Sequence, residues 1–319
     1  MSVTLQEIHR AADRIKRHIH HTPVLRSRSL DERVGAQVFL KCENLQKVGA
    51  FKFRGACNAI FSLTGNQARS GVATHSSGNH AQALARAAEL RGLPAYIVMP
   101  DNAPSVKRAA VAAYGGQITL CEPTLAAREQ TLAQVVEKTG ANVIHPYNDE
   151  RVIAGQGTAA LELLEELPGL DVIIAPVGGG GLLSGTSIAA TEINEEIRVI
   201  GAEPELADDA YRSLQAGRIV PSVKPQTIAD GLLTSLGTLT FPIIQQRVEQ
   251  IVTVSEPGII ESMRFVWERL KIIIEPSAAV AVGALWERKL DLRGLKVGII
   301  ISGGNVDLGS LPWLSQGPL

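Results

Sequence analysis

The sequence predicts an α/β protein in which two open, mainly parallel β-sheets are flanked by helices. Short apolar runs rich in β-branched residues alternate with stretches of helical periodicity along the chain, as they do when parallel strands are joined by helical crossovers. This alternation occupies both halves of the 319 residues, a length that exceeds one average domain. We therefore expect two lobes, each built on its own sheet.

The elements follow one another in a regular order. An amphipathic helix is expected over residues 5–19, where apolar side chains recur at steps of three and four. Because ligands of such sheets bind beyond the carboxyl ends of the strands, the loops at those ends are the expected place for a site. Strands are expected at 37–43, 71–76, 95–100, 117–123, 142–146, 171–177, 198–204, 250–256 and 296–304, with helices between them.

Composition excludes several classes of function. The chain is 45% hydrophobic and 20% charged with a net charge of -1, so it has no basic excess to favour nucleic acid or an anionic membrane. The three cysteines, Cys42, Cys57 and Cys121, form no C-x-x-C pair, which argues against a disulfide framework or a zinc site. The amino terminus is charged, and no long apolar run follows. We expect a cytoplasmic protein with a small-molecule partner.

A glycine run is the most specific motif. Such a run lets backbone N–H groups converge on an anion at the start of a helix, so it predicts a phosphate site, with a tight strand-to-helix turn as the alternative. The dinucleotide fingerprint and the Walker A loop each fail here at a required position. Four consecutive glycines lie between an apolar strand and a helix: Gly178, Gly179, Gly180 and Gly181.

A second helix start is rich in polar side chains. A helix amino terminus with hydroxyl and amide groups suits a substrate carboxylate. Ordinary N-capping by serine or asparagine is an equally good reading of the motif. The residues follow the strand expected at 71–76: Ser76, Ser77, Gly78, Asn79 and His80.

One lysine stands between two aromatic residues in the stretch "GAFKFRGA". A Schiff-base lysine must be unprotonated part of the time, and apolar walls from Phe51 and Phe53 would lower the pKa of Lys52. Its expected place at a helix start has the same effect. On this stretch alone, a structural lysine that extends its amine to solvent is the simpler reading. Arg54 points to another face and is expected to be structural.

Two further polar motifs follow strands of the second half. Ser302 ends an apolar strand before two glycines and can hydrogen-bond a ring nitrogen, although a capping serine in a turn is the simpler reading. Glu203 and Asp209 flank a loop and offer hard oxygen ligands for Mg²⁺ or Ca²⁺, with a solvated acidic loop as the alternative.

Taken together, these motifs resemble the fold-type II pyridoxal-phosphate enzymes, and among them the serine/threonine dehydratase and serine racemase group. The resemblance implies a tryptophan synthase β-like fold with two open, twisted sheets. It also implies a large cofactor-binding domain formed by residues 1–70 and 149–319, and a small domain, 71–148, that closes over the substrate. The matching stretches are collinear: "QKVGAFKFRGA", "HSSGNHAQALA", "VIAGQGTAALE", "PVGGGGLLSG", "AEPELADDAYRS", "TIADGL", "IEPSAAVAV" and "SGGNVDL".

The resemblance also implies how pyridoxal 5′-phosphate is bound. Lys52 would carry it as a Schiff base, and Phe51 would pack against its ring. Asn79 would hydrogen-bond its phenolic oxygen, and Ser302 would meet its pyridine nitrogen. The glycines at 178–181 would hold its phosphate.

The same resemblance implies the substrate and metal contacts. The segment Ser76 to His80 would grip the substrate carboxylate, and Ser77 would act as a second acid/base on the face opposite the lysine. The divalent cation, Mg²⁺, Mn²⁺ or Ca²⁺, would be bound by Glu203, the carbonyl of Ala207 and Asp209. Relatives of this kind are commonly homodimers, so a homodimer is expected.

The expected activity is loss of water from L-serine or L-threonine, giving a 2-oxo acid and ammonia. Arg128 matches a region near the substrate's β-substituent and could meet a second carboxylate, so 3-hydroxyaspartate ammonia-lyase activity is an alternative, as is serine racemisation. An arginine on a helix surface is the plain reading of Arg128. A cofactor-binding protein without lyase activity is a further alternative, and an NAD-linked oxidoreductase is disfavoured by the glycine spacing.

Overall fold

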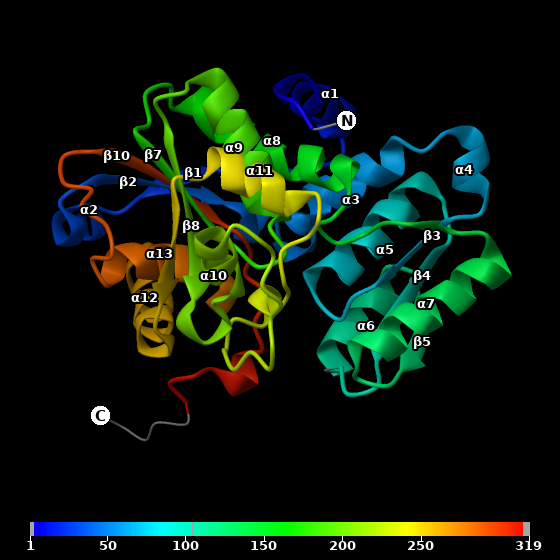
Figure 1. Ribbon diagram of the computed structural model, residues 1–319. Helices are drawn as coiled ribbons and strands as arrows, with labels where there is room; N and C mark the ends of the chain where they lie inside the picture. The colour runs from blue at the N-terminus through cyan, green and yellow to red at the C-terminus, as the bar shows by residue number, and fades with distance from the viewer. Residues whose placement is uncertain (1–2, 104, 315–319) are drawn as a thin grey trace.

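The computed structural model describes residues 3–103 and 105–314. It contains two sheets, which lie in separate lobes (Figure 1). The larger sheet is parallel except for one antiparallel edge strand, β1, and the smaller sheet is parallel throughout. In spatial order the large sheet comprises β1 (Val24–Arg26), β2 (Gln37–Cys42), β10 (Lys296–Ile301), β7 (Val172–Pro176), β8 (Arg198–Pro204) and β9 (Gln250–Val254); the small sheet comprises β5 (Gln117–Cys121), β4 (Ala95–Pro100), β3 (Val72–His75) and β6 (Asn142–Val143).

Helices cover both faces of each sheet (Figure 1). The α-helices are α1 (Leu5–Ile15), α2 (Arg28–Val34), α3 (Lys52–Phe61), α4 (Gly65–Arg69), α5 (Asn79–Arg91), α6 (Ser105–Ala113), α7 (Leu125–Thr139), α8 (Glu150–Glu166), α9 (Gly181–Ile193), α10 (Asp209–Ala216), α11 (Thr240–Arg247), α12 (Glu256–Leu270) and α13 (Pro276–Trp286). Short 3₁₀ turns are η1 (Glu43–Leu45), η2 (Lys47–Gly49), η3 (Glu205–Ala207), η4 (Asp230–Leu232) and η5 (Leu308–Ser310).

The large sheet is buried on both faces, and its strands are therefore almost wholly apolar. Along β7, Val172 and Ile174 pack into the core under α12 and α13, while Ile173 and Ala175 pack into the core under α8 and α9. Successive side chains of a strand point to opposite faces. This two-sided burial explains why the strand reads as a continuous apolar run.

The fold class and all nine expected strands are confirmed. The expectations missed β1, because its three residues are too short for a periodic signal. The first helix begins after a Thr4 capping box and ends at Ile15, four residues before the expected end. Among the described residues, no helix is both long enough and apolar enough to cross a membrane. The exact domain boundaries remain a prediction.

Candidate active site

The turn that carries Lys52 and the segment that begins at Ser302 meet at the end of the large sheet. The chain leaving β10 pairs with the turn before α3: the Phe51 amide donates to the Ser302 carbonyl at 2.9 Å, and the Gly304 amide donates to the Gly49 carbonyl at 2.9 Å. Gly49 has a positive φ of 68°, and a Cβ there would lie 2.6 Å from the Asn305 Oδ1. Glycine is therefore required for the close approach of the two segments.

The amine of Lys52 lies in a partly apolar environment at the first residue of α3. Its Nζ donates to the Pro146 carbonyl at 2.8 Å and lies 5.2 Å from the centre of the Phe51 ring. Burial lowers the pKa of Lys52 to about 8, against the opposing effect of the negative charge of Glu275. Near neutral pH a useful fraction of the amine is therefore unprotonated.

Only one of the two phenylalanines flanks that amine. Phe53 is fully buried in the core between α3 and α5, and its ring lies 5.9 Å from the Nζ of Lys47. The expectation that Phe53 walls the lysine is wrong, because adjacent residues of a helix point to different faces. Arg54 is fully buried and paired with Glu43 and Glu162, as its structural assignment requires.

The glycine run forms the start of α9. Gly180 has a φ of 89° and is the N-cap, without any side-chain cap. A Cβ at Gly179 would lie 2.3 Å from the Tyr147 ring, and one at Gly178 would lie 3.0 Å from the Leu232 Cα. The first N–H groups of the helix have no intrahelical acceptor, so the loop fits a phosphate.

The polar helix start of α5 is not an ordinary cap. Its N-cap is Gly78, and no side chain caps the helix, so capping by serine or asparagine does not explain the motif. The Ser76 hydroxyl instead accepts from the Gly78 amide at 3.3 Å. The His80 ring is buried, with Nε2 3.1 Å from the Ile144 carbonyl, and burial lowers its pKa to about 3. Because this contact turns the His80 ring inward, only the backbone N–H of His80 can act at the start of the helix.

A buried carboxyl, Glu275, links several of these parts and was not singled out from the sequence. Asn79 Nδ2 donates to its two oxygens at 2.9 and 3.2 Å, and the Asn305 amide donates to it at 3.1 Å. Asn305 Nδ2 donates to Asn79 Oδ1 at 2.9 Å, which fixes the orientation of the Asn79 amide. Burial, and then the charge of Asp230, raise the pKa of Glu275 to about 7. A glutamate before a proline in an otherwise apolar stretch was the available signal.

Arg128 lies on α7, on the small-sheet side. It is half-buried, and its Nε donates to the Thr124 carbonyl at 3.3 Å. Burial, and then the positive charge of Arg128, lower the pKa of His75, which ends β3. The His75 ring lies 6.3 Å from the ring of His145, which in turn lies 4.6 Å from the ring of Tyr147. Arg128 therefore lies near a row of rings, His75, His145 and Tyr147, of which the last contacts the glycine loop.

The two carboxyls that flank the acidic loop after β8, Glu203 and Asp209, are buried, whereas Glu205 within the loop is exposed. The carboxylate of Glu203 accepts from the amides of Ala210 and Tyr211, both at 2.8 Å. Both oxygens of Asp209 are buried and accept no hydrogen bond of normal geometry within the described parts of the chain, although the Ser222 hydroxyl is near enough to oppose the rise in the Asp209 pKa. Burial raises the pKa of Glu203 to about 9 and that of Asp209 to about 6. Two such carboxyls beside the Ala207 backbone suit a hard cation, although residues 3–103 and 105–314 contain no cluster of three or more histidine, cysteine or acidic ligands.

The Pro146 carbonyl that accepts from Lys52 is followed in the chain by Tyr147, whose ring lies against Gly179, so the lysine and the glycine loop belong to one site. An amine that can lose its proton near neutral pH, together with an anion-binding loop, is what an aldehyde cofactor with a phosphate group requires. The fold and site therefore define an enzyme that works through such a cofactor. The family model described as "Pyridoxal-phosphate dependent enzyme" matches residues 15–303. This chain belongs to the pyridoxal-phosphate dependent enzyme family.

Its similarities span nearly the full length of known proteins. It is 51% identical to the β-hydroxyaspartate dehydratase of Paracoccus denitrificans over 97% of this chain and 98% of that protein. The crystal structure of serine racemase from Dictyostelium discoideum superposes with a TM-score of 0.93 at 52% identity, over 97% of this chain and 100% of that one. The crystal structure of a T.th. threonine deaminase superposes with a TM-score of 0.91 at 43% identity, over 96% of this chain and 99% of that one.

Proposed function

We propose that this protein removes water from a small L-β-hydroxy amino acid, L-serine or L-threonine, to give a 2-oxo acid and ammonia. The observation that carries the proposal is the amine of Lys52, with a pKa of about 8, next to the glycine cradle. Pyridoxal phosphate, when bound, supplies an electron sink for a negative charge at the substrate α-carbon. The water lost in the elimination is taken up again when the released product is hydrolysed to the 2-oxo acid and ammonia, so the atoms balance.

Residues of this chain are proposed to transfer the proton and to bind the substrate and the cofactor. Lys52 takes the α-proton as a general base. The free N–H groups at the start of α5, beside Ser76 and Gly78, hold the substrate carboxylate. Phe51, Ser302 and Asn79 would hold the cofactor, at its ring, its pyridine nitrogen and its phenolic oxygen respectively.

A second substrate, 3-hydroxyaspartate, is favoured by the position of Arg128. A cation that acts on His75 from within the small-sheet lobe can pair with a second carboxylate. The similar protein named β-hydroxyaspartate dehydratase supports the same choice. Serine racemisation requires a proton donor on the opposite face of the substrate, and Ser77 is the residue we assign to it.

The acidic loop after β8 is proposed to bind a divalent cation. Glu203, Asp209 and the carbonyl of Ala207 would be its ligands, because the buried oxygens of Asp209, which accept no close hydrogen bond, suit a hard ion. We also propose a homodimer with a large domain of residues 1–70 and 149–319 and a small domain of residues 71–148.

The test is 2-oxo acid release by the cofactor-loaded protein with L-serine, L-threonine and the threo and erythro isomers of L-3-hydroxyaspartate, with chiral analysis of remaining serine. Lys52→Ala should lower kcat by at least about 10³-fold with every substrate. Substantial turnover by that variant would disprove the proposal. No 2-oxo acid and no racemisation from any substrate, in a protein that binds the cofactor, would identify a non-catalytic binding protein.

A further inference from the structure

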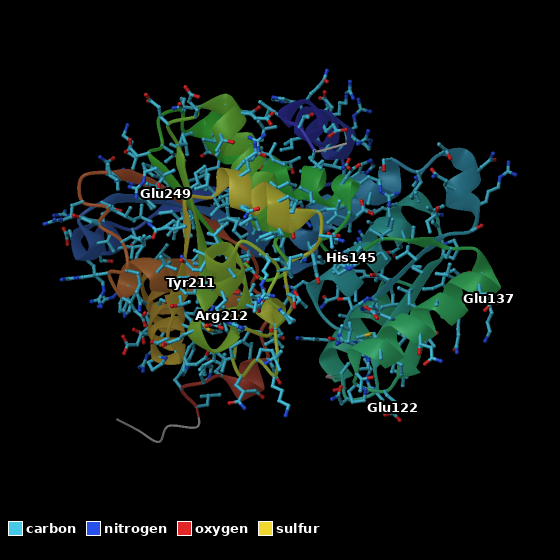
Figure 2. All side chains as sticks on the ribbon, viewed as in Figure 1. Glu122, Glu137, His145, Tyr211, Arg212 and Glu249 are labelled. Atoms are coloured by element: carbon cyan, nitrogen blue, oxygen red, sulfur yellow. The ribbon has the colours of Figure 1, made fainter. Side chains whose placement is uncertain are left out.

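The segment from His145 to Asn148 joins the end of the small sheet to α8 and touches the reactive lysine. The Pro146 carbonyl accepts a hydrogen bond from Lys52 Nζ at 2.8 Å. Immediately beside it, His145 Nδ1 accepts the backbone N–H groups of Tyr147 at 3.3 Å and of Asn148 at 2.9 Å. Figure 2 labels His145 where the two lobes meet.

A single peptide plane connects the histidine to the lysine. The carbonyl of Pro146 and the N–H of Tyr147 belong to the same planar unit, and in a trans peptide they point in opposite directions. The described residues contain no cis peptide bond. An acceptor that holds the N–H therefore fixes the direction of the carbonyl that faces Lys52.

On the small-sheet side, His145 is the group that holds the peptide plane between Pro146 and Tyr147. Pro146 has a restricted φ and lacks an N–H of its own. On the other side, the Tyr147 ring packs against Gly179, and the side chain of Asn148 bonds the Thr238 hydroxyl and the Leu239 amide. The plane is thus held between the small sheet and the loops of the large sheet.

The acceptor role requires a neutral ring with its hydrogen on Nε2. Burial, and then the charges of His75 and Lys52, lower the pKa of His145 to about 4. The ring is therefore neutral throughout the physiological range, and Nδ1 remains an acceptor. This histidine acts as a fixed acceptor in that range and does not need to exchange protons.

We propose that His145 is a positioning residue, which orients the Pro146 carbonyl so that this carbonyl holds the amine of Lys52 whenever the amine is not bonded to the cofactor. The inference rests on the proposed function, in which Lys52 alternates between a covalent bond to the cofactor and a free amine. A free lysine side chain has four rotatable bonds, and an acceptor at 2.8 Å keeps its nitrogen at the reacting centre.

The test compares His145→Leu with His145→Asn in the holoenzyme. Asparagine places an oxygen close to the position of Nδ1 and can accept the same backbone N–H groups, whereas leucine cannot. His9→Leu, on the exposed side of α1, is the matched control. Two readouts are needed: steady-state kinetics, and stopped-flow absorbance of the lysine-linked cofactor as glycine displaces Lys52 and is then diluted away.

His145→Leu should retain the cofactor, lose about 10- to 100-fold in kcat with KM changed less than about 3-fold, and slow the return of Lys52 after glycine dilution by about 10-fold. His145→Asn should restore both rates to within about 3-fold of the parent. His9→Leu should match the parent throughout.

Two results would overturn the inference. Parent-like return of Lys52 in His145→Leu would show that the histidine only shapes the turn. An asparagine variant that keeps the parent melting temperature but is as slow as leucine would show that the acceptor at this position is irrelevant. Glycine has no β-hydroxyl and gives no elimination, so this absorbance readout judges the inference even if the substrate panel disproves the proposed function.

Discussion

The turns that end the large sheet pack closely against their neighbours, whereas the turn before α5, at the end of the small sheet, has open space at Gly78. Residues 49–51 pair through the backbone with residues 302–304, and a Cβ at Gly179 would lie 2.3 Å from the Tyr147 ring. At the small sheet, a Cβ on Gly78 would meet no atom within 4 Å. The comparison indicates that the glycine loop and the turn before α3 tolerate little change, whereas the backbone at Gly78 has room to vary.

This difference gives the family similarities a physical meaning. Similar proteins carry the names of a hydroxyaspartate dehydratase, a serine racemase and a threonine deaminase. A rigid cofactor side can support all of these reactions, because the cofactor carries the electron chemistry. Under the proposed function, substrate choice would depend on a few side chains near the small sheet, such as Arg128 and Ser77.

The largest loss of activity is expected from a substitution in the glycine loop at the end of the large sheet. Gly179→Ala would drive a methyl group into the Tyr147 ring and displace the glycine loop, so kcat/KM should fall by at least about 100-fold. Equilibrium dialysis should show weaker cofactor binding. Gly65→Ala, where a Cβ meets nothing within 4 Å, is the control and should match the parent. A variant at 179 that binds cofactor normally would show that this loop is less constrained than its contacts indicate.

Near the small sheet, Ser77→Ala should separate two activities. Racemisation of serine should fall by about 10²-fold or more, since it needs a proton donor on the second face. Elimination should change less than about 3-fold, because Lys52 remains. Chiral chromatography and 2-oxo acid assays on the same samples measure both rates. Equal losses in the two would assign Ser77 to substrate binding instead.

Arg128→Gln should change substrate preference with little change in fold. A charged hydrogen bond contributes roughly 1.5–3 kcal/mol, so kcat/KM for 3-hydroxyaspartate should drop by about 10- to 100-fold. The value for L-serine should stay within about 3-fold. Lys138→Gln, an exposed change on the same helix, provides the control. A uniform loss across substrates would place Arg128 outside the specificity site.

The smallest effect concerns stability at the acidic loop. Mg²⁺ near 100 times its Kd should stabilise the fold by about 2.7 kcal/mol, which calorimetry would record as a rise of roughly 5 °C in Tm. Asp209→Asn should abolish this rise, and Asp208→Asn should keep it. A cation effect that survives Asp209→Asn would refute the ligand assignment.

The same loop has a pH dependence with a definite sign. Glu203 and Asp209 have raised pKa values, about 9 and about 6, so without cation their contribution to stability is present at low pH and is lost as pH rises through those values. Protons compete with the cation for the carboxylates. The rise in Tm caused by Mg²⁺ should therefore grow from pH 6 to pH 8.

Much of the fold was predictable because the inner strands of both sheets are buried. A strand covered on two faces must be apolar along its length, as β7 is, and that run is visible in the chain itself. The strand β1 was not predictable, since three residues at an edge carry no periodicity. Phe53 was wrongly placed beside Lys52 because residue type alone does not show to which side of α3 a side chain points.

By itself, the sequence determined the two-sheet α/β architecture and the family, because periodicity, glycine runs and collinear motifs can be read along the chain. It also predicted the glycine loop and Lys52 as site residues. Only the tertiary structure decided which distant groups meet: Glu275 with Asn79 and Asn305, the Pro146 carbonyl with Lys52, and Tyr147 with Gly179. Such contacts join residues far apart in the chain, and burial then sets their pKa values. Neither these long-range contacts nor the burial of the groups produces a periodic pattern in the sequence.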